Sequence, residues 1–273
     1  MSATTVTAEL PAKSTRVPRR PRLVSAEFLK LRKRRSLVLS GLALTVLPMI
    51  IGYTVLLSVH AANPAKHGPA GGVDNLSGSI GLLSTLGVIV AILIGSTLGA
   101  GDLSAGVFRE LVITGRSRLA LFAARIPAGL ALVWALVGAG FAIAATASTV
   151  FAGSLGVPSA TLLVETALWL ALVSGLSLVL ALGISSLLGS RAITIGVVLG
   201  WQIVAGPLLL HIKLLGSFRE TLVGAATERL EPSALFDGTR TVSMSIAAAM
   251  IVVVAWTIVP LALGAWRTVT RDA

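Results

Sequence analysis

The sequence alternates between long apolar runs and short polar segments, and the lengths of the apolar runs predict six transmembrane helices. The runs cover residues 37–59, 80–100, 126–152, 161–187, 193–210 and 244–266. With a rise of ~1.5 Å per residue, each run covers the ~30 Å hydrocarbon core of a bilayer as an α-helix. We therefore predict an all-α membrane protein whose six-helix transmembrane domain spans residues 37–273.

Glycine and proline mark special positions inside these runs. Gly95 and Gly99 in the second run, and Gly196 and Gly200 in the fifth, are four residues apart. This spacing puts both glycines of a pair on one helix face, where a neighbouring helix can approach closely. Pro48, near the middle of the first run, predicts a kink.

The region before the first run divides into a tail and an amphipathic helix. Residues 1–21 have no apolar period and are predicted to be a disordered basic tail. Residues 22–36 predict an interfacial helix, because one face collects Leu23, Val24, Phe28 and Leu31. The basic residues Lys30, Arg32, Lys33, Arg34 and Arg35 follow towards the membrane. We interpret them as an anchor on the cytoplasmic side in contact with anionic lipids, and not as a nucleic-acid site.

Composition and charge agree with a multi-pass membrane protein. The chain is 55% hydrophobic with a net charge of +11, and its mean hydropathy is +0.93. All but five of the 22 Lys and Arg residues fall on one side if the N-terminus is cytoplasmic. By the positive-inside rule, both termini then lie in the cytoplasm. The excess of Arg over Lys and the abundant Ala indicate coding DNA rich in G and C, hence a bacterial, actinobacterium-like source and a plasma-membrane location.

A charged segment, residues 101–125, lies between the second and third runs. It contains Asp102, Arg109, Glu110, Arg116, Arg118 and Arg125. Each unpaired charge buried in a bilayer costs ~2.5–3.5 kcal/mol, so the segment is predicted to lie in water. The spacing of Leu103, Val107 and Leu111 predicts a short amphipathic helix, and Ser117 is placed to cap the next helix. Arg125 is expected to reach lipid phosphates.

Between the fifth and sixth runs, residues 213–240 form a polar segment with a helical apolar repeat. Leu214, Phe218 and Leu222 recur at helical spacing, and Pro232 ends the pattern. We predict one or two short external helices.

The sequence offers no catalytic or metal-binding constellation. It contains no GxxxxGK[ST] motif for nucleotide phosphates, and His60, His67 and His211 are scattered. No catalytic, cofactor or metal residue is therefore predicted. Glu165 lies near the start of the fourth run and is interpreted as an interfacial carboxylate. Gln202, near the middle of the fifth run, either makes a hydrogen bond between helices or lines a substrate path.

Several of these features together resemble the membrane-spanning permease subunits of ABC transporters of the type-2 exporter class. The first is the pattern Glu27-Phe28-Leu29-Lys30, followed by Arg34 and Arg35, before the first span. The second is the cytoplasmic segment with Asp102, Gly106-Val107, Leu111, Ser117-Arg118 and Arg125.

The resemblance implies a transport subunit that is not itself an enzyme. A separate ABC ATP-binding subunit, holding ATP and Mg, is expected to bind residues 101–118 as a coupling helix. A second copy, or a related permease, is expected to complete the path. The implied interface consists of Asp102, Phe108, Arg109, Glu110, Leu111, Arg116 and Arg118, beside the interfacial helix with Glu27, Lys30, Arg34 and Arg35.

Two other functions are compatible with the sequence. One is an ion-coupled secondary transporter, although no Asp, Glu, Lys or Arg lies near the middle of a run. The other is a membrane anchor or assembly protein without a transport path.

Overall fold

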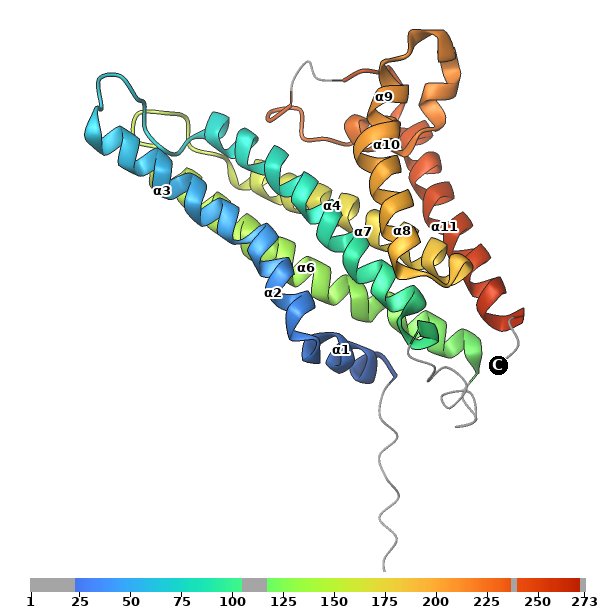
Figure 1. Cartoon of the computed structure of the whole chain (residues 1–273). Helices are drawn as coiled ribbons and strands as arrows, with labels where there is room; N and C mark the ends of the chain where they lie inside the picture. The colour runs from blue at the N-terminus through green and yellow to red at the C-terminus, as the bar shows by residue number, and fades with distance from the viewer. Residues whose placement is uncertain (1–22, 105–116, 237–239, 271–273) are drawn as a thin grey trace, which may run out of the picture.

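Six helical segments cross the length of the molecule and confirm the predicted all-α membrane fold. The computed structural model describes residues 23–104, 117–236 and 240–270, leaving aside the side chains of residues 102–104. In these ranges the segments long and apolar enough to span a membrane are Arg35–Ala62, Val73–Gly101, Arg118–Val150, Ala160–Leu188, Arg191–His211 and Ile246–Thr270. Figure 1 shows them side by side.

A short helix precedes the first span and lies at an angle to it. Helix α1 (Leu23–Lys33) sits at one end of the bundle (Figure 1). Leu31, only 1% exposed, and the partly buried Phe28 form its inner face. The basic residues of its last turn, Lys30, Arg32 and Lys33, precede the membrane span.

The first span is broken in its middle, where Pro48 predicted a kink. Helix α2 (Arg35–Thr45) ends before Val46, and α3 (Leu47–Ala62) begins after it with Pro48 in its first turn. Proline has no N–H to donate to the preceding turn, so the helix loses one backbone hydrogen bond here. The break lies against α6 (Arg118–Val150), where the carbonyl of Thr45 leaves no space for a side chain at Gly140.

The second span begins earlier than predicted. Helix α4 (Val73–Ser104) starts seven residues before residue 80, in a stretch that polar residues made look like a loop. Its first turns have their own apolar face, because Leu76 and Ile80 are fully buried. Asp74 lies in the first turn, where a carboxylate favours the positive end of the helix dipole.

The third span also begins earlier than predicted, at Arg118 instead of residue 126. The side chain of Ser117 caps α6 by accepting a hydrogen bond from the N–H of Ala120 at 3.2 Å. The predicted cap is therefore confirmed, and it is the cap of the third span itself. Apolar run length marks the part of a helix that lies in lipid and not the whole helix.

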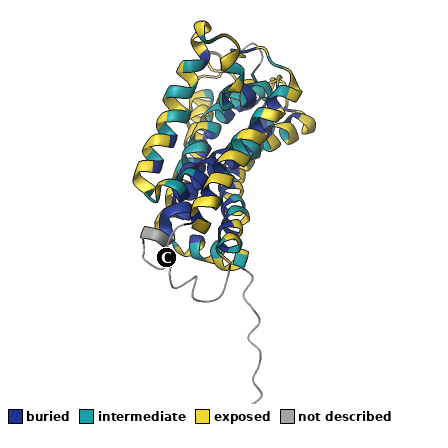
Figure 2. Ribbon diagram, turned by 90° about the vertical axis from the view of Figure 1, so that its right-hand side faces the viewer, coloured by how far each residue is buried: buried dark blue, intermediate teal, exposed yellow. Residues whose placement is uncertain are grey.

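The fourth span is the central helix of the bundle. In helix α7 (Ala160–Leu188), 67% of the most apolar window is buried inside the protein, against 17% for the first, fifth and sixth spans. Its main neighbours are α4 and α11 (Ile246–Thr270). Figure 2 shows buried residues along these inner faces and exposed residues outside.

Small residues allow α7 to approach both neighbours at backbone distance. At Gly99 of α4, an added Cβ would lie 2.7 Å from the carbonyl oxygen of Leu182, and at Gly95 it would overlap that of Leu178. On the other side, a Cβ at Gly183 would overlap the carbonyl of Pro260 in α11. The expectation of close packing at Gly95 and Gly99 is confirmed.

The second glycine pair behaves differently. A Cβ built at Gly196 or Gly200 has no atom within 4 Å other than its own helix. No neighbouring helix within the described chain uses this face, so the same spacing that marks a contact in α4 marks none here.

The fifth span is divided into three pieces, and a compact polar segment follows it. The pieces are α8 (Arg191–Leu199), a π-helical turn η1 (Gly200–Ala205) and α9 (Gly206–His211). The next segment contains a 3-10 helix η2 (Lys213–Thr221) and α10 (Val223–Arg229). Gly216, with φ 50°, interrupts η2, and Leu214 is 96% exposed. The apolar repeat there does not form one buried α-helical face.

The close contact between α4 and α7 makes a testable prediction. Gly95→Ala should lower the free energy of unfolding by about 1–3 kcal/mol, because its methyl group overlaps backbone atoms of α7. The matched control is Gly81→Ala in the same helix, where an added Cβ meets nothing within 4 Å. This control should be neutral or stabilising, since alanine favours a helix over glycine by about 0.5–1 kcal/mol. Unfolding in mixed micelles measures both, and equal effects would contradict the packing.

Candidate functional site

The segment predicted to contact a partner lies between the end of α4 and the start of α6. Phe108, Arg109, Glu110, Leu111 and Arg116 lie outside the described residues. Asp102 lies in the last turn of α4, and its side chain is also outside them. The two edges of this stretch, the end of α4 and the start of α6, are described and fix where it begins and ends.

Three other elements meet the edges of this stretch. Figure 1 shows α1 and the last turn of α11 at the same end of the molecule as the edges. Arg118, the first residue of α6, donates a hydrogen bond from Nη1 to the carbonyl oxygen of Val269 at 3.1 Å. The guanidinium of Arg34 lies beside Gly101, where an added Cβ would be 3.5 Å from Nη2. The first, second, third and sixth spans therefore converge here.

The predicted residues of α1 form a local ion pair. The carboxylate of Glu27 lies 2.8 Å from Nζ of Lys30. A separation of three residues puts both side chains on the same face of a helix. Arg35, the first residue of α2, is exposed.

The environment of Arg125 differs from the predicted one. It was expected to reach lipid phosphates at the inner end of the third span, but it is only 2% exposed. Because α6 begins at Arg118, Arg125 lies two turns inside the helix and faces the protein interior. The early start of α6 therefore explains the difference.

The second candidate region is the π-helical turn in the middle of the fifth span. Pro207, just after the turn, cannot donate a backbone hydrogen bond, and the N–H of Gly206 bonds to Trp201 five residues back. A single π-helical turn inside an α-helix is frequently found at functional sites. Gly200, Gly206 and Pro207 were the sequence signals for this irregularity, and the prediction did not use them.

Gln202 lies in this turn and makes the predicted contact between helices. Its Oε1 accepts a hydrogen bond from the hydroxyl of Ser177, in α7, at 2.9 Å. Gln202 also lines two cavities, of about 90 Å³ and about 230 Å³. The hydrogen bond between helices is therefore present, and the lining of a substrate path by Gln202 stays a prediction.

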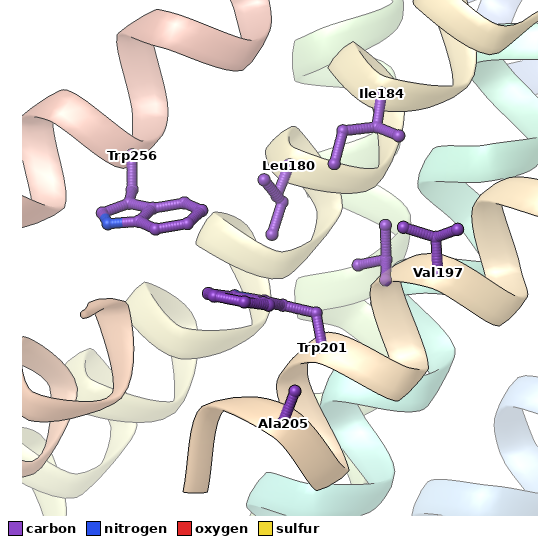
Figure 3. Close-up of a pocket in the computed structure, with 7 residues that line it drawn as sticks. Leu180, Ile184, Val197, Trp201, Ala205 and Trp256 are labelled. Carbon is purple, nitrogen blue, oxygen red and sulfur yellow. The ribbon is translucent and has the colours of Figure 1, made fainter. Parts of the chain in front are cut away.

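Two tryptophans next to this turn were not identified from the sequence. The rings of Trp201 and Trp256 are stacked, with centroids 6.0 Å apart and an interplanar angle of 27°. They line an apolar cavity of about 410 Å³ together with Leu180, Ile184, Val197, Val198 and Ala205 (Figure 3). Trp256 is held in place by its indole N–H, which donates to the carbonyl of Thr221 at 2.9 Å.

Trp201 differs from Trp256 in its hydrogen bonding. Its indole nitrogen is buried and has no hydrogen-bond partner among the described residues. Burying a hydrogen-bond donor without a partner lowers stability. Trp201, where this occurs, lies in the π-helical turn.

These features define a multi-pass membrane protein with cavities along an irregular fifth span. A sequence model of the ABC-2 family transporter protein matches residues 23–204, which is more than half of the chain. The chain belongs to this family, and it is a membrane-spanning subunit of an ABC transporter. Membrane proteins of this family work with ATP-binding subunits. No curated protein sequence matches the chain.

The bond between α7 and the π-helical turn gives a testable prediction. In a double-mutant cycle with Ser177→Ala and Gln202→Leu, we expect a coupling energy of about 0.6 kcal/mol in the free energy of unfolding, typical of hydrogen bonds between transmembrane helices. Ser174→Ala is the control, because that hydroxyl donates only within α7. Additive effects of Ser177→Ala and Gln202→Leu would show that the bond is not formed.

Proposed function

We propose that this chain is the transmembrane subunit of an ATP-driven exporter in a bacterial plasma membrane. A separate ATPase subunit docks on residues 101–118, and a second permease subunit, identical or related, completes the substrate path. The observation that carries the proposal is the convergence of four spans and α1 around the edges of this stretch. A partner that binds at this end therefore lies next to four of the six spans.

The need for a separate ATPase follows from the sequence. The chain contains no GxxxxGK[ST] motif, the loop whose backbone N–H groups hold nucleotide phosphates. ATP and Mg are accordingly assigned to the partner subunit. The asymmetry of Lys and Arg supports a cytoplasmic location of this end, on the side where ATP is available.

The roles of individual residues follow from charge and position. We assign Arg109, Glu110 and Arg116 to ion pairs or hydrogen bonds with the ATPase, and Phe108 and Leu111 to apolar contacts. Asp102 and Arg118 mark the two edges of the contact. Since Arg118 already bonds to Val269, it also passes displacement of the segment to α11.

The substrate path is proposed to pass Gln202. Cavities lie on both sides of this residue, in a span whose regular helix is interrupted. The neighbouring cavity with Trp201 and Trp256 is lined by apolar side chains. Such a lining favours a hydrophobic or amphipathic substrate over a charged one.

Charge reversal tests the docking of the ATPase. Arg109→Glu and Glu110→Lys, made separately, should each reduce co-purification of the ATPase subunit by about ten-fold, because truncated or reversed charge pairs at interfaces cost several kcal/mol. The amount of permease in the membrane should not change. The measurement is the ratio of ATPase to permease after purification through a tag on the permease.

The matched control is Lys66→Glu, which reverses one charge in the connection after α3, at the other end of the bundle (Figure 1). It should leave the ratio unchanged. Wild-type ratios in both Arg109→Glu and Glu110→Lys would contradict docking on this segment.

A further inference from the structure

A polar cavity lies between the ends of three spans, and it shares Arg34 with the first region described above. Its volume is about 520 Å³. It is bounded by the start of α2, the last turns of α4 and the start of α8. The lining residues are Arg34, Ser36, Leu37, Ser40, Thr97 and Arg191. No function considered so far uses this cavity.

The cavity brings together two cationic side chains that are far apart in the sequence. Arg34 comes from the turn between α1 and α2, and Arg191 is the first residue of α8. None of the lining residues is acidic. Within the described part of the chain, the one ion pair joins Lys30 to Glu27, so neither guanidinium has a carboxylate within 4.0 Å there. Two arginines facing one space without a counter-charge favour an anionic ligand.

The remaining lining groups fit the same kind of ligand. No side chain caps α2, and the N–H groups of Leu37 and Val38 bond to the carbonyl oxygen of Arg34 at 3.0 Å and 3.2 Å. The first turns of α2 and α8, where a helix dipole is positive, contribute Ser36 and Arg191 to the lining. The hydroxyls of Ser40 and Thr97 donate to carbonyls in their own helices, at 3.1 Å and 2.7 Å. The donors left for a ligand are therefore the two guanidiniums and the hydroxyl of Ser36.

The position of the lining residues along the spans indicates the source of the ligand. Arg34 directly precedes the first span, Arg191 begins the fifth, and Thr97 lies one turn from the end of the second at Gly101. All three positions belong to the same membrane surface, where the phosphate groups of phospholipids lie. Below the arginines, Leu37 supplies an apolar wall.

We propose that this cavity binds the phosphate of an anionic phospholipid headgroup between Arg34 and Arg191. A bidentate guanidinium contact from each side would hold the phosphate and join the first, second and fifth spans at this membrane surface. The bound group is a phosphate in either case, and the position of the cavity at the ends of the spans favours a lipid over free phosphate. The inference does not depend on the ATPase or on the direction of transport.

The test uses the purified full-length chain in detergent and measures its thermal unfolding during titration with short-chain phosphatidylglycerol. Arg34→Gln and Arg191→Gln should each weaken the apparent affinity for this lipid by about ten-fold, the loss of one charge-assisted contact. The double variant should show no stabilisation beyond that given by short-chain phosphatidylcholine. Arg267→Gln is the matched control: it removes one charge from the last turn of α11, which does not line the cavity, and should bind like wild type.

Two further measurements complete the test: a titration with inorganic phosphate, and the lipid affinity of two lysine variants. Inorganic phosphate at the same concentrations should stabilise the chain far less than phosphatidylglycerol; equal stabilisation would overturn the assignment to a lipid. Arg34→Lys and Arg191→Lys keep the charge and should recover part of the affinity, which separates loss of binding from loss of folding. Equal lipid affinity in wild type and in both Gln variants would overturn the site.

Discussion

The structure depends on backbone-distance contact between α7 and its two neighbours. In a bilayer, apolar surface gives little drive for helices to associate, because lipid tails are as apolar as the side chains. Dispersion and close fit must provide the attraction, and they require small residues at the crossing points. Gly95 and Gly99 of α4 meet that need against α7, and Gly183 of α7 meets it against α11. The fourth span is therefore the fixed core of the protein, while the first, fifth and sixth spans remain mostly exposed.

This division of the bundle has a mechanical consequence. The end of α4 and the start of α6 border residues 105–116, and Arg118 ties α6 to the last turn of α11. A displacement at this end is carried by rigid, closely packed helices. The fifth span is different, because its π-helical turn and the cavities around Gln202 leave it loosely packed. The proposed path thus lies beside the part of the bundle that can rearrange at the lowest cost.

The number and class of the spans could be predicted from the sequence, because an apolar run of about 20 residues is long enough to cross a bilayer and too apolar for a water-facing helix. The start of α6 was predicted through its cap at Ser117, but α4 begins before its apolar run, since helices extend into segments whose polar residues resemble loops. The pair Gly95 and Gly99 was predicted correctly, but the identical spacing at Gly196 and Gly200 meets no neighbour. The spacing of two glycines identifies a helix face but not the helix that packs on it.

Other features join segments that are distant in the sequence, and no local pattern predicts them. They are the stacking of Trp201 on Trp256 and the cavity that Arg34 and Arg191 share.

The central claim is that the end of the bundle around residues 101–118 lies in the cytosol and is covered by an ATPase. The chain has no cysteine, so an introduced cysteine is unique. Ser117→Cys should react with a membrane-impermeant maleimide in inside-out vesicles but not in intact cells, and bound ATPase should protect it. Lys66→Cys, at the other end, should show the reverse accessibility and no protection. Labelling of Ser117→Cys from outside intact cells, or labelling unaffected by the ATPase, would contradict the account.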